Sequence, residues 1–201
     1  METFLSICVG IGLSAACGFR VFVPLLVMSI ASLSGHMHLA HGFEWIGTYP
    51  ALVSFAVATA LEIAGYYVPW LDHLLDTIAT PAAIVAGTIA TASAVGDMSP
   101  FLRWTLGVIA GGGAAGLIQG GTVLARAASG ATTGGMANPV VSSVELAGAT
   151  ITSILAIVAP VVAVLLFLTV VVLFSRKILK KFRSSPSAPE IESRLPVSAS
   201  R

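Results

Sequence analysis

The stretch from Ile151 to Phe174, ITSILAIVAPVVAVLLFLTVVVLF, contains no charged residue. An α-helix needs about 20 consecutive apolar residues to cross the hydrocarbon core of a bilayer. The rest of the chain shares this bias, with 56% hydrophobic and 9% charged residues among 201, whereas soluble domains carry about 25% charged residues. So few charges cannot cover a water-facing surface. The sequence therefore predicts an all-α integral membrane protein, a polytopic bundle of transmembrane helices.

The apolar stretch at the start of the chain, Phe4 to Leu33, is longer than one membrane crossing. As a single helix it would measure about 45 Å, against a hydrocarbon core of about 30 Å. Two interpretations are open: one tilted and kinked span, or two helical pieces with a break near Gly18. Gly18 follows small residues and Pro24 comes shortly after it, which favours the broken form.

Three further spans are expected in the middle of the chain, from about Pro50 to Tyr67, from Pro81 to Val95 and from Trp104 to Ala125. Proline is favoured in the first turn of a helix, so Pro81 is expected to open a helix. Residues 71–80 are expected to form a separate helix that is either interfacial or lines a cavity. The run 96–100 is typical of a turn. Together with the spans at the two ends, this predicts five full spans and one or two broken or re-entrant helices.

The second long stretch begins at Asn138-Pro139, which is a helix start signal with Asn as the N-cap. Residues 127–138 before it are small and rich in Gly and Thr, and we expect a loop there. A helix from Pro139 to Phe174 would be about 54 Å long. We therefore expect a short helix that ends near Gly148, followed by a full span; an ordinary kinked helix is the alternative. Discontinuous helices of this kind often mark binding sites in transporters.

Basic residues follow the last span directly: Arg176, Lys177, Lys180, Lys181 and Arg183. The positive-inside rule places such a cluster in the cytoplasm. We predict a transmembrane domain over residues 1–175 and a tail over 176–201, basic at first and then disordered because it is rich in Ser and Pro. The expected location is a bacterial inner membrane, with the C-terminus cytoplasmic.

Three stripes of small residues predict close helix packing. They are Gly112, Gly116 and Gly120; Ala56, Ala60 and Ala64; and Ala86, Ala90 and Ala94. Helices in a bilayer associate through close backbone contact along such faces. The stripes therefore predict a tight bundle, and they say nothing about activity.

Ionisable residues at membrane depth cost roughly 2.5 to 3.5 kcal/mol each and usually face a protein interior or a cavity. Glu62 lies about 160° around its helix from Ala60, so we expect it to point away from the alanine stripe, on a face with Thr59 and Tyr66. Two interpretations are open for Glu62. It either lines a functional site or forms a structural pair, for instance with Arg20.

Further polar residues are expected to join Glu62. Asp72 and Asp76 share one helical face, where they either hold a proton or cation between them or form a solvated turn. Glu145 and Ser142 follow Asn138 on the second polar segment, and Arg20 and Arg126 supply compensating charge. Polar segments in an apolar chain are costly unless they satisfy each other. We predict one polar pocket formed by Glu62, Asp72, Asp76, Asn138, Ser142, Glu145, Arg20 and Arg126.

No motif of an enzyme or a cofactor site is present in the sequence. His36, His38 and His41 could ligate a transition metal, but their spacing alone is a weak signal, and we predict no metal site. Gly10 and Gly12 begin a GxG without the third glycine or a preceding strand of a dinucleotide site. We expect no catalytic residues, no cofactor and no nucleic-acid partner.

Two runs of residues resemble a known family. The first runs from Glu62 through Pro69 and Asp72 to Asp76, and the second, 133–145, contains Thr-Gly-Gly, Asn-Pro, Ser and Glu. Both are similar to runs in a family of bacterial multi-pass membrane proteins, domain-of-unknown-function family 4126, and the resemblance covers about Ile11 to Phe174. Arg20 departs from the Asn that we associate with that position. The resemblance implies a multi-pass membrane fold and supplies no activity.

Two classes of function remain open, and a third, an intramembrane enzyme, is disfavoured because the sequence has no nucleophile–base or metal constellation. The leading hypothesis is a small channel or transporter for an ion or small polar solute, with the acidic residues along its path. The alternative is a non-transporting scaffold or assembly factor, in which the buried charges are paired struts. The lipid bilayer is the expected partner in both cases, and the small-residue stripes are compatible with a homo-oligomer.

Overall fold

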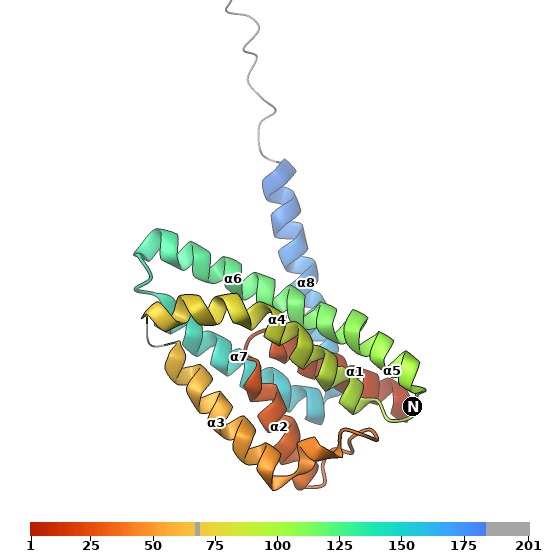
Figure 1. The fold of residues 1–201 in the computed structure, drawn as a ribbon. Helices are drawn as coiled ribbons and strands as arrows, with labels where there is room; N and C mark the ends of the chain where they lie inside the picture. The colour runs from red at the N-terminus through yellow and green to blue at the C-terminus, as the bar shows by residue number, and fades with distance from the viewer. Residues whose placement is uncertain (67–68, 184–201) are drawn as a thin grey trace, which may run out of the picture. The chain divides into compact units, whose positions relative to one another are not determined.

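All the secondary structure in the described part of the chain is helical (Figure 1). The computed structural model describes the backbone of residues 1–66 and 69–183, and the side chains of residues 1–66 and 77–176. The elements in chain order are α1 (Glu2–Cys17), α2 (Phe22–Leu33), the 3-10 segment η1 (Glu44–Gly47), α3 (Tyr49–Gly65), α4 (Pro69–Ala94), α5 (Pro100–Leu106), the π-helical segment η2 (Gly107–Gly112), α6 (Gly113–Thr133), α7 (Asn138–Val158) and α8 (Pro160–Arg183).

The chain divides into two compact units, Met1–Phe167 and Leu168–Arg201. The first contains α1 to α7 and the beginning of α8. The described part of the second is the remainder of α8, which stays helical to Arg183. The division falls before the boundary expected after residue 175. The expected disordered tail, 184–201, lies outside the described residues.

The first apolar stretch is broken at the expected place. Helix α1 ends at Cys17, Gly18 is its C-cap, and α2 begins at Phe22. A Cβ atom at Gly18 would lie 2.5 Å from the Ala115 carbonyl oxygen and 2.6 Å from the Ile118 Cβ. Glycine at this position therefore lets α1 end directly against α6.

Helix α3 buries the face opposite to the one expected to pack. Ala56, Ala60 and Ala64 are exposed in this chain, whereas Thr59 and Glu62 are buried. The prediction that the alanine stripe packs within the bundle is therefore wrong. The polar face is turned inward because its carboxylate has partners on neighbouring elements, and small apolar residues need no protein partner in a bilayer.

Pro81 does not open a separate helix. Helix α4 is continuous from Pro69 to Ala94 with Pro81 inside it, so the expected division into an interfacial piece and a span is wrong. Pro81 cannot donate a hydrogen bond to the carbonyl of residue 77. The helix continues because the turns after it pack into the core, where Ala83, Ala86 and Ala90 are almost fully buried.

The segments α5, η2 and α6 follow one another without an interruption from Pro100 to Thr133. The helix therefore includes residues 127–133, which we expected in a loop. The turn is confined to 134–137, where Gly134 and Gly135 have φ angles of 61° and 86°. These values lie in the left-handed region that glycine adopts at little cost, so they explain where the helix stops.

The break in the second long stretch lies after Val158 rather than near Gly148. Ala159 has φ −140° and ψ 69°, and Pro160 begins α8. Proline lacks an N–H group and disfavours helical geometry in the residue before it. Gly148 lies inside α7, where a Cβ atom would be 3.7 Å from the Phe19 ring. The prediction of a short re-entrant helix is therefore wrong. Helix α7 does begin at Asn138, and its N-cap is Ala137 rather than Asn138.

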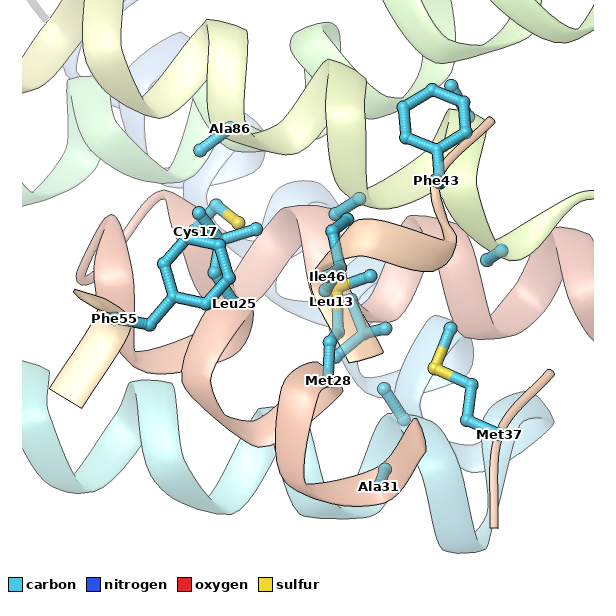
Figure 2. Packing of buried hydrophobic residues seen from close by; sticks show 14 of the residues in the cluster. Leu13, Cys17, Leu25, Met28, Ala31, Met37, Phe43, Ile46, Phe55 and Ala86 are labelled. Carbon is cyan, nitrogen blue, oxygen red and sulfur yellow. The ribbon is translucent and has the colours of Figure 1, made fainter. Parts of the chain in front are cut away.

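The core is built from small residues between closely spaced helices. Helix α1 packs against α4, α6 and α7, and α4 packs against η2. A Cβ atom at Gly87 would lie 2.6 Å from the Ala115 Cβ, and one at Gly111 would lie 2.5 Å from the Gly87 carbonyl oxygen. Larger side chains fill the space beside α2, where Figure 2 shows Leu13, Met28 and Ile46 gathered together.

Three described helices are long and apolar enough to cross a membrane: Thr77–Ala94, Pro100–Thr133 and Asn138–Val158. Four shorter apolar helices accompany them: Glu2–Cys17, Phe22–Leu33, Tyr49–Gly65 and Pro160–Arg176. The helices are thus compatible with a membrane protein. The division differs from the one expected, and the count of five full spans stays a prediction.

Candidate functional site

Four ionisable residues are buried where the α1–α2 break meets α3, α6 and α7. Arg20 is 2% exposed, Arg126 and Glu145 are each 5% exposed, and Glu62 is 8% exposed. Buried charges are costly unless they are paired and hydrogen-bonded. We call Arg20, Glu62, Tyr66, Arg126, Ser142 and Glu145 the buried charge cluster.

Glu62 accepts hydrogen bonds at the N-terminus of another helix. The Val21 backbone N–H donates to its Oε1 at 2.9 Å, and the Phe22 N–H donates to its Oε2 at 3.1 Å. The first N–H groups of a helix have no partner within the helix, and α2 has no side-chain cap of its own. The carboxylate also interacts favourably with the positive end of the α2 dipole. Glu62 therefore caps α2 from α3.

Glu145 and Arg126 form a two-pronged ion pair between α7 and α6. The Arg126 Nε donates to Glu145 Oε1 at 3.0 Å, and its Nη2 donates to Glu145 Oε2. The same Nη2 donates to the Ser142 hydroxyl at 3.0 Å. Paired N–H···O bonds of this kind are among the strongest in proteins and fix the geometry of both groups.

Arg20 reaches the same carboxylate from the α1–α2 break. Its Nη2 donates to the Ser142 backbone carbonyl at 3.0 Å and lies 3.7 Å from Glu145 Oε2. Its Nε and Nη1 are buried and have no hydrogen-bond partner within the described chain. Arg20 therefore holds α7 through one nitrogen and keeps two donors unused.

Tyr66 lies against both arginines. The Arg20 guanidinium carbon is 4.0 Å from the centre of the Tyr66 ring, and the corresponding distance for Arg126 is 4.1 Å. A guanidinium group over an aromatic face gains about 0.5–2 kcal/mol, the larger values applying to desolvated sites. Tyr66 thus stabilises two like charges that would otherwise repel each other in the protein interior.

The charges of the described members balance. Arg20 and Arg126 each carry one positive charge, and Glu62 and Glu145 each carry one negative charge when ionised. Glu62 also interacts electrostatically with Arg20 and Glu145, so the four groups form one system. Among the described residues, removing any one of these charges disturbs the balance of buried charge.

The structure brings together five of the eight residues expected to form a polar pocket: Arg20, Glu62, Arg126, Ser142 and Glu145. Asn138 is partly buried at the start of α7, where its backbone N–H donates to the Gly135 carbonyl at 3.0 Å. The side chains of Asp72 and Asp76 lie outside the described residues.

The glycines expected to mediate packing differ in their surroundings. A Cβ atom at Gly112 would lie 2.9 Å from the Thr88 Oγ1, and one at Gly116 would lie 3.4 Å from the Ile84 Cγ1. At Gly120 it would meet nothing within 4 Å. Close approach is therefore concentrated at Gly111 and Gly112, toward the N-terminal end of the predicted stripe.

Sequence reasoning missed two parts of the site. The backbone N–H groups of Val21 and Phe22 carry no side-chain signal, and only the helix break before α2 pointed to them. Tyr66 was placed on the face of Glu62, but its contact with both arginines was not foreseen. Its position four residues after Glu62, with two arginines nearby in polar segments, is the signal that could have indicated stacking.

A separate open pocket of about 520 Å³ lies beside the N-terminal part of α1. Glu2, His36, His38 and Asp97 contribute its polar lining. No group of three or more His, Cys, Asp or Glu side chains within the described ranges could hold a metal ion. Cys8 and Cys17 are both buried and unbridged. These residues are not part of the buried charge cluster.

Comparison with known proteins gives a family. No curated protein matches the chain, and no solved structure matches it. A family model does match, and it covers residues 7–180, which include α2 to α7 and every member of the buried charge cluster. The chain belongs to the family described as Domain of unknown function (DUF4126).

Proposed function

We propose that this chain is a small multi-pass channel or transporter of a bacterial inner membrane. In this proposal the buried charge cluster binds an ion or small polar solute on its way across, and the chain catalyses no reaction. Asp72 and Asp76 remain predicted members of the path. The cluster of basic residues in the last turns of α8, between Arg176 and Arg183, supports a cytoplasmic C-terminus.

The observation that carries the proposal is the state of Arg20. It is 2% exposed, yet its Nε and Nη1 have no hydrogen-bond partner within the described part of the chain. A charged group whose buried N–H donors have no acceptor costs several kcal/mol of stability. Native proteins rarely retain such donors unless water, an ion or a ligand satisfies them. A bound solute supplies the missing acceptor.

The position of the cluster supports the same conclusion. It lies at a break between two helices, and discontinuous helices often form the binding sites of transporters. Its polar groups come from four separate segments of the chain. A ligand that binds there contacts several elements at once, so it can shift their relative positions during transport.

Flux through purified protein in liposomes tests the proposal. Chloride, nitrate, potassium and sodium currents and osmotic swelling in urea or glycerol should reveal at least one permeant solute for the wild type. Arg20→Gln should lower that flux at least tenfold. Arg103→Gln removes a positive charge from α5, outside the cluster, and should leave the flux unchanged. Absence of any flux from correctly inserted wild-type protein would contradict the proposal.

A non-transporting scaffold is the second candidate, and the contacts of Glu62 and Glu145 favour it. Both Glu62 oxygens accept backbone hydrogen bonds, and Glu145 is paired with Arg126. Such groups can serve as struts alone. A scaffold predicts that cluster variants lower the stability of the protein while no solute ever crosses the liposome membrane.

A further inference from the structure

We propose that the Glu62 carboxylate occupies a binding site for a small monovalent anion, and that chloride, nitrate or formate takes its place when this carboxylate is absent. The proposal rests on the proposed function and deepens it by naming the class of ion. It assigns the site to the first N–H groups of α2 and to Arg20.

The two backbone donors already bind a carboxylate. Val21 N–H and Phe22 N–H lie 2.9 and 3.1 Å from the two oxygens of Glu62. The N-terminus of a helix combines unpaired N–H groups with the positive end of the dipole, which together bind anions. Helix α2 has twelve residues, about three turns, so the positive end of its dipole lies at Phe22. Formate has the same two oxygens as the side chain that it would replace.

Arg20 supplies the second observation. It is the residue directly before Val21, and its positive charge acts on the Glu62 carboxylate. Its buried Nε and Nη1 have no acceptor among the described residues, while Nη2 is held by the Ser142 carbonyl and Glu145. An anion that replaces the tethered carboxylate is free to move toward these unused donors.

Charge balance leads to the same class of ligand. With Glu62 ionised, the two arginines and two glutamates among the described residues sum to zero. Among the described residues, loss of the Glu62 charge leaves one buried positive charge in excess. Uncompensated buried charge is strongly destabilising, and one monovalent anion restores neutrality. A cation would increase the imbalance.

Rescue of a truncated variant by an added anion tests the inference. Glu62→Ala is purified in detergent in a buffer whose anion is gluconate, which is too large to enter a buried site. Thermal unfolding is then followed while formate, chloride or nitrate is titrated. We expect the Tm to rise with saturation, by roughly 5 °C when the anion exceeds its Kd about a hundredfold. Wild-type protein should respond far less at the same anion concentrations, because its own carboxylate competes with the anion for the site.

Two control variants separate binding from ionic strength and from general stabilisation. Glu44→Ala removes an exposed carboxylate that also accepts a backbone N–H, from Gly42, and it should not respond to anions. Glu62→Ala combined with Arg20→Gln should lose the rescue. Glu62→Ser also removes the carboxylate and leaves its space open, and it should bind the same anions if Glu62→Ala does not fold.

The outcomes distinguish this inference from the proposed function. An equal response of Glu44→Ala, or no saturable response of either Glu62 variant, would overturn the anion site. Anion rescue together with an absence of flux in liposomes would keep the site and remove the transport function. Flux of a cation or neutral solute without anion rescue would keep transport and remove the anion site.

Discussion

The Glu145 carboxylate contacts both buried arginines, so it is their shared counter-charge. It accepts two hydrogen bonds from Arg126 and lies 3.7 Å from the Arg20 Nη2. A buried ion pair of this kind contributes little net stability compared with an apolar pair, but removal of one partner is costly. The stability is lost because the charge that remains is buried without its partner.

Glu145→Gln should therefore lower the free energy of unfolding by about 3–5 kcal/mol, since two buried guanidinium groups lose their shared counter-charge. Denaturant or thermal unfolding in detergent measures this. The exposed carboxylate of Glu44 gives a matched control, and Glu44→Gln should change stability far less. Equal effects of the two substitutions would show that Glu145 is not buried between the arginines.

Tyr66 gives a second test at the scale of single residues. Tyr66→Phe keeps the ring against both guanidinium groups, whereas Tyr66→Leu removes it at similar hydrophobicity. We expect Tyr66→Leu to be less stable than Tyr66→Phe by about 1–2 kcal/mol, because two cation–π contacts are lost. Both variants lack the hydroxyl group, so the difference in stability between them reports on the ring alone. Equal stability of Phe and Leu would contradict the stacked arrangement.

Among the helices, local signals located some boundaries and tertiary packing displaced others. The break near Gly18 was predictable because small residues, a glycine and a proline coincide there. The second break was misplaced because Gly148 has another role: it lets the Phe19 ring approach α7. A single sequence does not separate a glycine that ends a helix from one that admits a neighbour. Pro160 carries the local signal for the actual break, because proline disfavours helical geometry in the residue before it.

The sequence predicted which face of a helix is buried only where that face carries a charged residue. Glu62, Arg20, Arg126, Ser142 and Glu145 were expected together because isolated polar groups at membrane depth are costly. The alanine face of α3 was misassigned because lipid-facing and protein-facing positions are both apolar in membrane helices. Which arginine pairs with which glutamate depends on the exact rotation of α6 and α7, and the sequence carries no signal for it.

The close approach of the helices at Gly111 can be tested by substitution. Gly111→Leu should destabilise the bundle strongly, because a Cβ atom there would lie 2.5 Å from both the Gly87 carbonyl oxygen and the Thr91 Oγ1. Gly120→Leu, on the same long helix, is the matched control, since nothing lies within 4 Å of the new Cβ. Yield and Tm in detergent should fall for the first and change little for the second. A comparable loss at Gly120 would indicate that this face packs against a second copy of the chain.

For the whole molecule, the basic residues after the last apolar segment set the expected orientation. The five basic residues between positions 176 and 183 should stay in the cytoplasm. A reporter enzyme that is active only in the periplasm, fused after Arg183, should therefore be silent, while a cytoplasmic reporter at the same position should be active. Periplasmic activity at this position would reverse the topology that we propose.

The central claim is that the buried charge cluster contains an anion-binding site and that the Glu62 carboxylate occupies this site. Crystals of Glu62→Ala grown in bromide test it most directly, because bromide scatters anomalously and its position is seen without assumptions about its neighbours. The account predicts one anomalous peak within hydrogen-bond distance of the Val21 and Phe22 N–H groups and next to Arg20. Crystals in which this position holds no bromide, with peaks only on the protein surface, would contradict it.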